Sequence, residues 1–105
     1  MKILFDQGTP APLRRYLTGH IVATAYEQGW ANLSNGELLK AAEEAGYQLF
    51  ITTDQNLRYQ QNLSERLLAI VVLLSTSWPR ISLHVDEILR IINAVGAGDY
   101  VEISI

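Results

Sequence analysis

The chain has 105 residues, of which 49% are apolar and 18% are charged, and it contains no cysteine. This length suits a single domain, and the normal apolar fraction excludes intrinsic disorder. The lack of cysteine excludes a disulfide framework, a thiolate zinc site and a cysteine nucleophile, so the expected location is the cytoplasm. A net charge of −3 argues against a protein that coats nucleic acid by charge alone. A polyanionic substrate would therefore need a local source of positive charge.

No membrane association or export is expected from the apolar runs. The longest run, Leu67 to Leu74, has eight residues, whereas a spanning helix needs about 20. The first apolar run is interrupted by Asp6, where a signal peptide would continue its apolar core.

The first quarter of the chain predicts two strands around a short helix. The apolar run Ile3–Phe5 is typical of a buried strand, and residues 20–26 are rich in strand-favouring types. Between them, Thr9 as N-cap and Pro10 as first helical residue predict a helix that closes at Gly19.

The middle of the chain predicts a helix followed by two buried strands. Ser34 and Glu37 have capping-box spacing, which predicts a helix that stops at Gly46. Residues 49–53 and 69–74 are apolar runs, the second too short and too β-branched for a helix.

The last part of the chain completes the predicted fold. The polar stretch 55–64 indicates a connection, and 83–95 has helical periodicity. Residues 100–105 alternate strictly, which is typical of an edge strand with one buried face. Strands that alternate with helices predict an α/β fold with a mostly parallel sheet of about five strands, covered on both faces.

Two acidic residues follow predicted strands, and a third begins a predicted helix. Asp6 and Asp54 stand at strand ends. In an open parallel sheet the working crevice lies beyond the carboxyl ends of the strands, where the strand order reverses. If these strands are neighbours, their carboxylates repel each other unless they share a cation. Glu37 lies in a first helical turn on the same side of the sheet, so three acids are predicted to face one pocket.

Three carboxylates with waters suit Mg²⁺ or Mn²⁺ rather than zinc. Such ions activate water and stabilise the departing oxygen of a phosphodiester. A metal here would supply the positive charge that the overall composition lacks.

Each acid also has a structural interpretation. Glu37 fits the reciprocal half of a capping box with Ser34, and its spacing supports that role equally well. Asp54 fits as a cap of the segment after it, and Asp6 as an acceptor for turn amides before Pro10. The spacing leaves both interpretations open, while the convergence of three acids favours the metal site.

A phosphoryl-accepting receiver domain also places acids at strand ends, and Asp54 suits its acceptor position. Receivers, however, follow the first strand with an adjacent acidic pair and place a lysine after the last core strand. Here Asp6 is followed by Gln7, and the only lysines are Lys2 and Lys40. The sequence therefore disfavours a receiver domain.

Two segments, ILFDQGTPAPLRRYL and NGELLKAAEEAGYQLFITTDQNLRYQQNL, together resemble the short PIN-like family long catalogued as a domain of unknown function. The resemblance extends from Met1 to about Ser77, with the ordered motifs LFD, NGELL and TTDQNL. It implies a single PIN-like domain over residues 1–105 with a Rossmann-like three-layer sandwich. It also implies cleavage of RNA by a water that Mg²⁺ or Mn²⁺ activates. Relatives with this core include toxin ribonucleases that are paired with antitoxins.

The family's metal ligands match three positions in this chain. Asp6 resembles the first-strand ligand, Glu37 the acid on the central helix, and Asp54 the acid of the T-x-D motif. PIN toxins commonly carry another aspartate two residues later, where this chain has Asn56. An amide can orient a water or a phosphate but adds no negative charge. This departure from the family pattern therefore counts against binding of two metal ions and against catalysis.

Four more side chains are predicted to contact substrate: Arg14, Arg58, Tyr59 and Gln61. Arginine with tyrosine can hold a phosphate and stack a base, although solvated arginine and packed tyrosine are the commoner roles. Trp78 follows the fourth predicted strand on the pocket side, and we interpret it first as a packing residue.

The sequence supports two functional hypotheses. The first is a metal-dependent endoribonuclease with the catalytic residues Asp6, Glu37, Asp54 and Asn56, in one version the toxin of a toxin–antitoxin pair. The second, favoured by Asn56 and the negative net charge, is a non-catalytic PIN-like module that binds RNA or a protein partner. In either case, the edge strand 100–105 is expected to allow two copies to pair as a homodimer.

Overall fold

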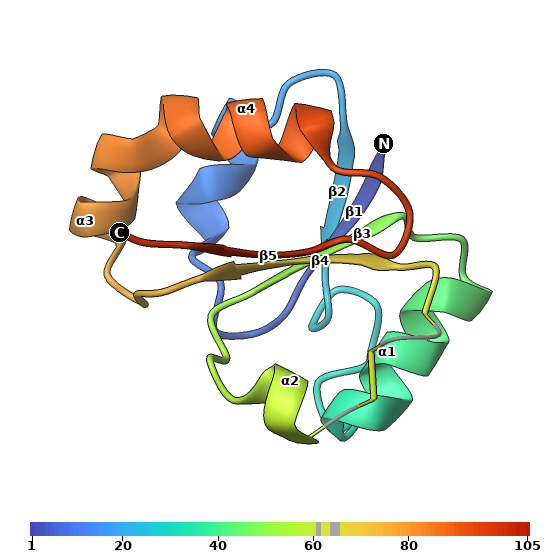
Figure 1. Cartoon of the computed structure of the whole chain (residues 1–105). Coiled ribbons are helices and arrows are strands. Elements are labelled where there is room, and N and C mark those ends of the chain that lie inside the picture. Colours follow the sequence, from blue (N-terminus) through green and yellow to red (C-terminus); the bar gives the residue numbers. More distant parts are fainter. Residues whose placement is uncertain (61, 64–65) are drawn as a thin grey trace.

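The structure, a computed structural model, describes residues 1–60, 62–63 and 66–105. Its single sheet has five parallel strands in the order β2-β1-β3-β4-β5 (Figure 1). The strands are β1 Lys2–Phe5, β2 Ile21–Thr24, β3 Leu49–Thr52, β4 Ala69–Leu73 and β5 Tyr100–Ile103. The predicted α/β fold with a parallel sheet is confirmed.

Helices cover both faces of the sheet and give three layers (Figure 1). The 3₁₀ segment η1, α3 and α4 pack on one face, while α1 and α2 pack on the other. Their bounds are η1 Ala11–Tyr16, α1 Asn35–Glu44, α2 Leu57–Gln60, α3 Trp78–Ile81, the 3₁₀ turn η2 Ser82–His84 and α4 Val85–Ala94. Within the described residues, no helix is long and apolar enough to cross a membrane.

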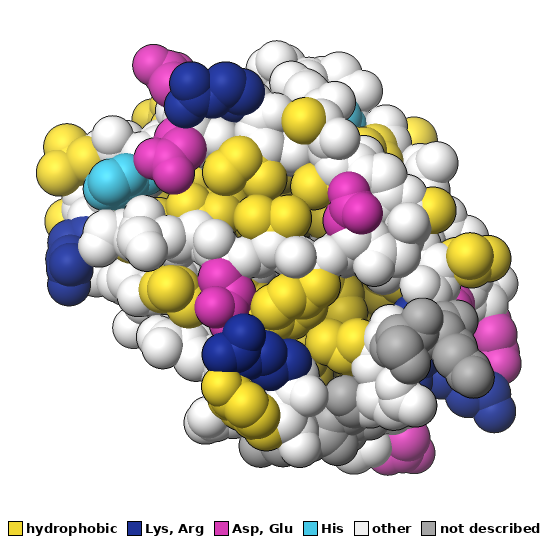
Figure 2. Space-filling view, in the orientation of Figure 1, with side chains coloured by type: hydrophobic (Ala, Val, Ile, Leu, Met, Phe, Trp, Pro, Cys, Tyr) yellow, Lys and Arg dark blue, Asp and Glu magenta, His cyan; other side chains and the backbone are white. Residues whose placement is uncertain are grey.

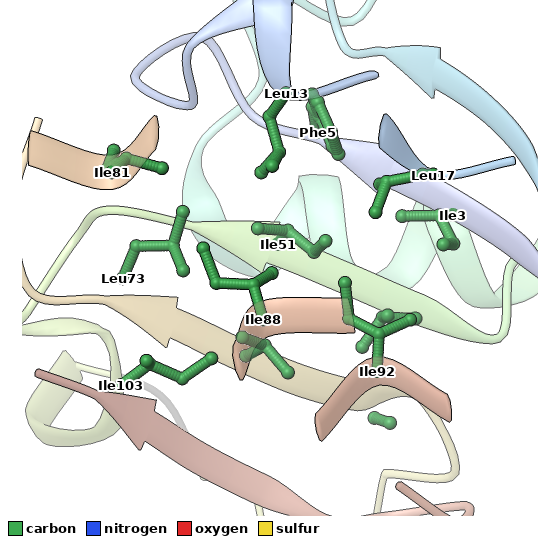
Figure 3. Close-up of a cluster of buried hydrophobic side chains, with 13 residues drawn as sticks. Ile3, Phe5, Leu13, Leu17, Ile51, Leu73, Ile81, Ile88, Ile92 and Ile103 are labelled. Atoms are coloured by element: carbon green, nitrogen blue, oxygen red, sulfur yellow. The ribbon is translucent and has the colours of Figure 1, made fainter. Parts of the chain in front are cut away.

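Alternate residues of each strand enter two separate cores because strand side chains point to opposite faces. In β1, Ile3 and Phe5 join the core under η1 and α4, whereas Leu4 joins the core under α1. Figure 3 shows side chains from the sheet, η1, α3 and α4 meeting in the first core. The central strands β3 and β4 are buried on both faces, which explains their continuous apolar runs.

The first predicted helix differs from the structure in type and start. It is a 3₁₀ segment that begins at Ala11, after Pro10 as N-cap, and ends at Tyr16 rather than at Gly19. Thr9 does not cap it, because the Thr9 hydroxyl lies 2.9 Å from the carbonyl oxygen of Ile51 and contacts that group instead of the helix. The predicted connection 55–64 also contains a short helix, α2.

The other predicted elements are confirmed with small changes in length. The capping box at the start of α1 is present, and Gly46 follows the helix with a φ of +83° that favours glycine. The last helix begins at Val85 rather than 83, after α3 and η2. β5 is an edge strand as predicted, and Figure 2 shows hydrophobic side chains on both sides of it.

Candidate functional site

The strand order reverses between β1 and β3, which pair side by side with Phe5 opposite Ile51. The chain leaves β1 toward β2 on one side and later returns to β3 on the other. Such a switch point opens a crevice beyond the carboxyl ends of the two strands. Asp6 directly follows β1, and Asp54 lies two residues after β3. The prediction that these acid-bearing strands are neighbours is confirmed.

Asp6 is a half-buried carboxylate held by two threonines. Its Oδ1 accepts from the Thr9 backbone N–H at 3.1 Å and lies 2.7 Å from the Thr9 hydroxyl. Its Oδ2 accepts from the Thr52 hydroxyl. Burial raises the pKa of Asp6 despite these hydrogen bonds, and the nearby negative charge of Asp54 raises it further. The Asp6 site therefore disfavours its own negative charge.

Asp54 is connected to Asp6 through one side chain. The hydroxyl of Thr52 donates to Asp6 and accepts from the backbone N–H of Asp54 at 3.0 Å. Asp54 Oδ1 accepts from the backbone N–H of Asn56 at 2.9 Å, and Oδ2 accepts from the Asn35 amide at 3.0 Å. Since Asn35 is the first residue of α1, a side chain from the start of this helix contacts the acid.

The two carboxylates have capacity for a cation. In the part of the chain that the structure describes, neither Asp6 nor Asp54 forms an ion pair with a lysine, arginine or histidine. Two carboxylates offer about eight acceptor positions, of which the described hydrogen bonds use at most five. Oxygen donors of this kind suit Mg²⁺ or Mn²⁺, so the residues present fit a hard divalent ion.

Glu37 is not brought into this cluster. Its Oε1 accepts from the backbone N–H of Ser34 at 3.1 Å and from the Ser34 hydroxyl at 2.8 Å. These bonds lower the pKa of Glu37, whose side chain is exposed. Among the described residues, no three or more acidic or histidine side chains form a group that could hold a metal. The capping-box interpretation of Glu37 is thus realised, and the pair Asp6 and Asp54 forms the acidic centre.

Among the predicted substrate residues that the structure describes, Arg14, Arg58 and Tyr59 contact partners other than the two acids. Arg14 forms a bidentate ion pair with Glu27, with nitrogen–oxygen distances of 2.5 and 3.1 Å. Arg58 lies over the ring of Tyr59, 4.7 Å from its centroid, and 3.7 Å from Glu102 on β5. Both arginines are therefore already paired. Gln61 lies outside the described residues, and Asn56 is exposed in the loop after Asp54.

Asp6 lines two clefts. The small cleft, about 150 Å³, includes Asp6, Trp30 and Asn35. The large cleft, about 490 Å³, includes Asp6 together with Tyr26 and Trp78. A further cleft of about 400 Å³ is lined by Lys40, Glu43, Glu44, Asn62 and Arg66, and so includes neither Asp6 nor Asp54.

Sequence reasoning missed the residues that hold the acids in place. Thr52 stands two positions before Asp54 in the T-x-D motif, and this spacing was its only signal. Asn35 follows the N-cap Ser34, where polar residues are common, so the sequence offers no reason to assign it a contact with Asp54. Gly8 allows the β1 loop to approach β3, since a Cβ there would lie 2.6 Å from the Thr53 hydroxyl.

Comparisons with protein families, with curated proteins and with solved structures find no match for this chain.

Proposed function

We propose that this protein is a metal-dependent endoribonuclease in which Asp6 and Asp54 hold Mg²⁺ or Mn²⁺. The observation that carries the proposal is the pair of carboxylates at the switch point, linked by Thr52 and without a described cationic partner. The resemblance of the LFD, NGELL and TTDQNL motifs to PIN-like sequences supports the same chemistry.

The residues around the acids have defined roles in this proposal. When bound, the ion supplies a water of lowered pKa and stabilises charge on the phosphodiester oxygens. Thr52 positions the site because its hydroxyl donates to the Asp6 carboxylate and accepts from the backbone N–H of Asp54. The Asn35 amide orients Asp54 by donating to Oδ2. Such partners of metal ligands restrict their rotation and tune their basicity.

RNA is the proposed substrate because the family resemblance implies it, and the ion would neutralise part of the local negative charge. Toxin activity rests on the resemblance alone and would require an antitoxin partner. Induced expression in a bacterial host that arrests growth, with rescue by Asp54→Asn, would support that role. Normal growth at equal expression would remove it.

The decisive experiment combines manganese binding with RNA cleavage. Titration calorimetry should detect Mn²⁺ binding that Asp6→Asn and Asp54→Asn each weaken and that the double variant loses. Single-stranded RNA should be cleaved with Mn²⁺, and both EDTA and Asp54→Asn should stop the reaction. Unchanged manganese binding by the double variant would refute the site assignment.

The second candidate function is a non-catalytic module that binds RNA or a protein partner. Two observations favour it: Asn56 stands where PIN toxins carry an acid, and Glu37 is engaged with Ser34. The same assay decides between the candidates. Cleavage that persists through further purification and disappears in Asp54→Asn removes the module, whereas manganese binding without cleavage supports it.

A further inference from the structure

The large cleft beside Asp6 has an aromatic wall that the proposed chemistry does not use. Tyr26, in the turn after β2, and Trp78, the first residue of α3, both line it. Both line the cleft because they follow β2 and β4, and parallel strands end at the same edge of the sheet. Asp6 is the only charged residue among the described residues that line this cleft.

Trp78 is held in place while still reaching the cleft. Its side chain packs against the core of η1 and α4, and its ring centroid lies 5.9 Å from that of Tyr16, at an interplanar angle of 40°. The predicted packing role is therefore correct but incomplete, since the same side chain lines the cleft. Tyr26 is 76% exposed and makes an accessible part of the wall.

We infer that Trp78 and Tyr26 form a stacking subsite for an unpaired nucleobase of single-stranded nucleic acid, next to the phosphodiester at Asp6. This inference rests on the proposed function, which places the phosphodiester there. Aromatic side chains stack on the flat face of a base, and a base must be unpaired to enter such a cleft. The cleft volume, about 490 Å³, is in the range of sites that bury small organic groups.

The chemistry of the wall also restricts what the subsite can read. Thr9, Thr24 and Thr76 also line the cleft; the Thr9 hydroxyl contacts Asp6, and the Thr24 hydroxyl accepts from the Glu27 backbone N–H. The wall has no arginine or lysine among its described residues, so it offers no charge for a second phosphate. Stacking without charge recognises the base face, and we expect weak preference among the four bases.

The test measures base stacking directly, without metal and without cleavage. The chain has two tryptophans, so a Trp30→Phe background leaves Trp78 as the only tryptophan reporter. In EDTA, a ten-nucleotide oligouridylate with uncharged methylphosphonate linkages, which needs no metal to offset its charge, should quench this fluorescence, and the abasic polymer with the same linkages should not. A ten-base-pair RNA duplex should also leave the signal unchanged, because its bases are paired.

Variants separate stacking from a merely structural role. Trp78→Leu and Tyr26→Leu should each weaken oligouridylate binding about 10-fold while changing abasic binding less than about 2-fold. Because Trp78→Leu removes the tryptophan reporter, the affinities of the variants are measured by the fluorescence anisotropy of dye-labelled oligonucleotides. Trp78→Phe keeps an aromatic ring and should retain affinity within about 3-fold. Leu83→Ala is the matched control, because Leu83 is exposed on neighbouring η2 and is not among the residues that line the cleft.

Equal binding of oligouridylate and the abasic polymer, or unchanged affinity in Trp78→Leu, would overturn the stacking subsite. A failure of the nuclease proposal has a different signature. In that case the oligouridylate still quenches Trp78 and discriminates against the abasic polymer, while Mn²⁺ yields no cleavage products. Because binding is measured in EDTA, the outcome for the subsite is decided in every case.

Discussion

At the scale of single residues, Asp6 combines an unfavourable charge with a set of fixed hydrogen bonds. The Thr9 hydroxyl lies within hydrogen-bond distance of both Asp6 Oδ1 and the Ile51 carbonyl, yet it has one proton to donate. A protonated Asp6 resolves this competition, because it donates to Thr9 while Thr9 donates to Ile51. The raised pKa and the local geometry therefore agree.

Asp6→Asn should stabilise the metal-free protein at neutral pH. The pKa of Asp6 is raised above 3.8 in the folded state, so the folded protein favours the protonated carboxyl. The stability that this protonated form contributes is fully present below pH 3.8 and is lost as the pH rises through the folded pKa. In EDTA, we expect the melting temperature of Asp6→Asn to exceed that of the wild type at pH 7.5 by roughly 2–5 °C. The difference should shrink toward pH 4. A lower melting temperature at pH 7.5 would contradict this account.

Thr52→Val should damage both stability and metal binding. Thr52 is 1% exposed, and valine has a similar shape but leaves the Asp54 N–H without its hydroxyl acceptor. We expect the free energy of unfolding to fall by about 1–3 kcal/mol and manganese affinity to fall about 10-fold. Thr52→Ser, which keeps the hydroxyl, is the control. Chemical denaturation and calorimetry measure the two effects.

At the scale of elements, the start of α1 serves the fold and the candidate site with different residues. Ser34 and Glu37 satisfy the exposed helix N-terminus, and Asn35 between them reaches Asp54. The cap is complete without Asn35, whose amide donates to Asp54. One turn of helix thus anchors α1 and orients a candidate ligand.

Glu37→Gln should leave manganese affinity unchanged within about 2-fold, because glutamine at this position keeps a capping box while removing the charge. Calorimetry with Mn²⁺ measures the affinity, and the melting temperature reports the cap. Ser34→Ala is the companion variant and should cost about 1 kcal/mol of stability. A large loss of manganese affinity in Glu37→Gln would assign Glu37 as a third metal ligand.

The fold was predictable because its signals are local. The runs at β3 and β4 reflect burial on both faces, and the capping box fixes the start of α1 within the chain itself. α2 escaped prediction because its neighbourhood is polar and gives no helical periodicity.

The convergence of Asp6 and Asp54 was predictable because both acids follow predicted strands, Asp6 directly and Asp54 two residues after β3 ends. The arginine partners were not predictable, since Arg14 meets Glu27 and Arg58 meets Glu102 only after the chain folds. The placement of Trp78 at the cleft likewise depends on tertiary packing.

At the scale of the whole molecule, the edge strand β5 is partly protected by charge. The carbonyls of Asp99 and Ile103 accept from β4, and strand alternation turns the backbone of Glu102 outward. The Glu102 carboxylate accepts from the Tyr100 hydroxyl at 2.9 Å and lies near Arg58. Burial and this hydrogen bond raise the pKa of Tyr100 to about 12. The edge therefore presents its backbone groups beside a carboxylate that is hydrogen-bonded to Tyr100 and paired with Arg58.

The predicted homodimer can be tested by measuring the mass of the protein in solution. If β5 pairs between copies, sedimentation equilibrium should show twice the 11.8 kDa of one chain, with dissociation on dilution. Glu102→Pro removes the outward N–H and should shift the mass to that of one chain. A single-chain mass for the wild type at high concentration would contradict the prediction.

The strand order also has a consequence for folding. Asp6 and Thr52 are 46 residues apart in the chain, and β2 and α1 lie between them. A nascent or partly unfolded chain therefore holds the two acids on separate segments, and they meet only when β1 and β3 pair across this long separation. Any activity that depends on both acids would appear late in folding and all at once. Misfolded copies would be inert.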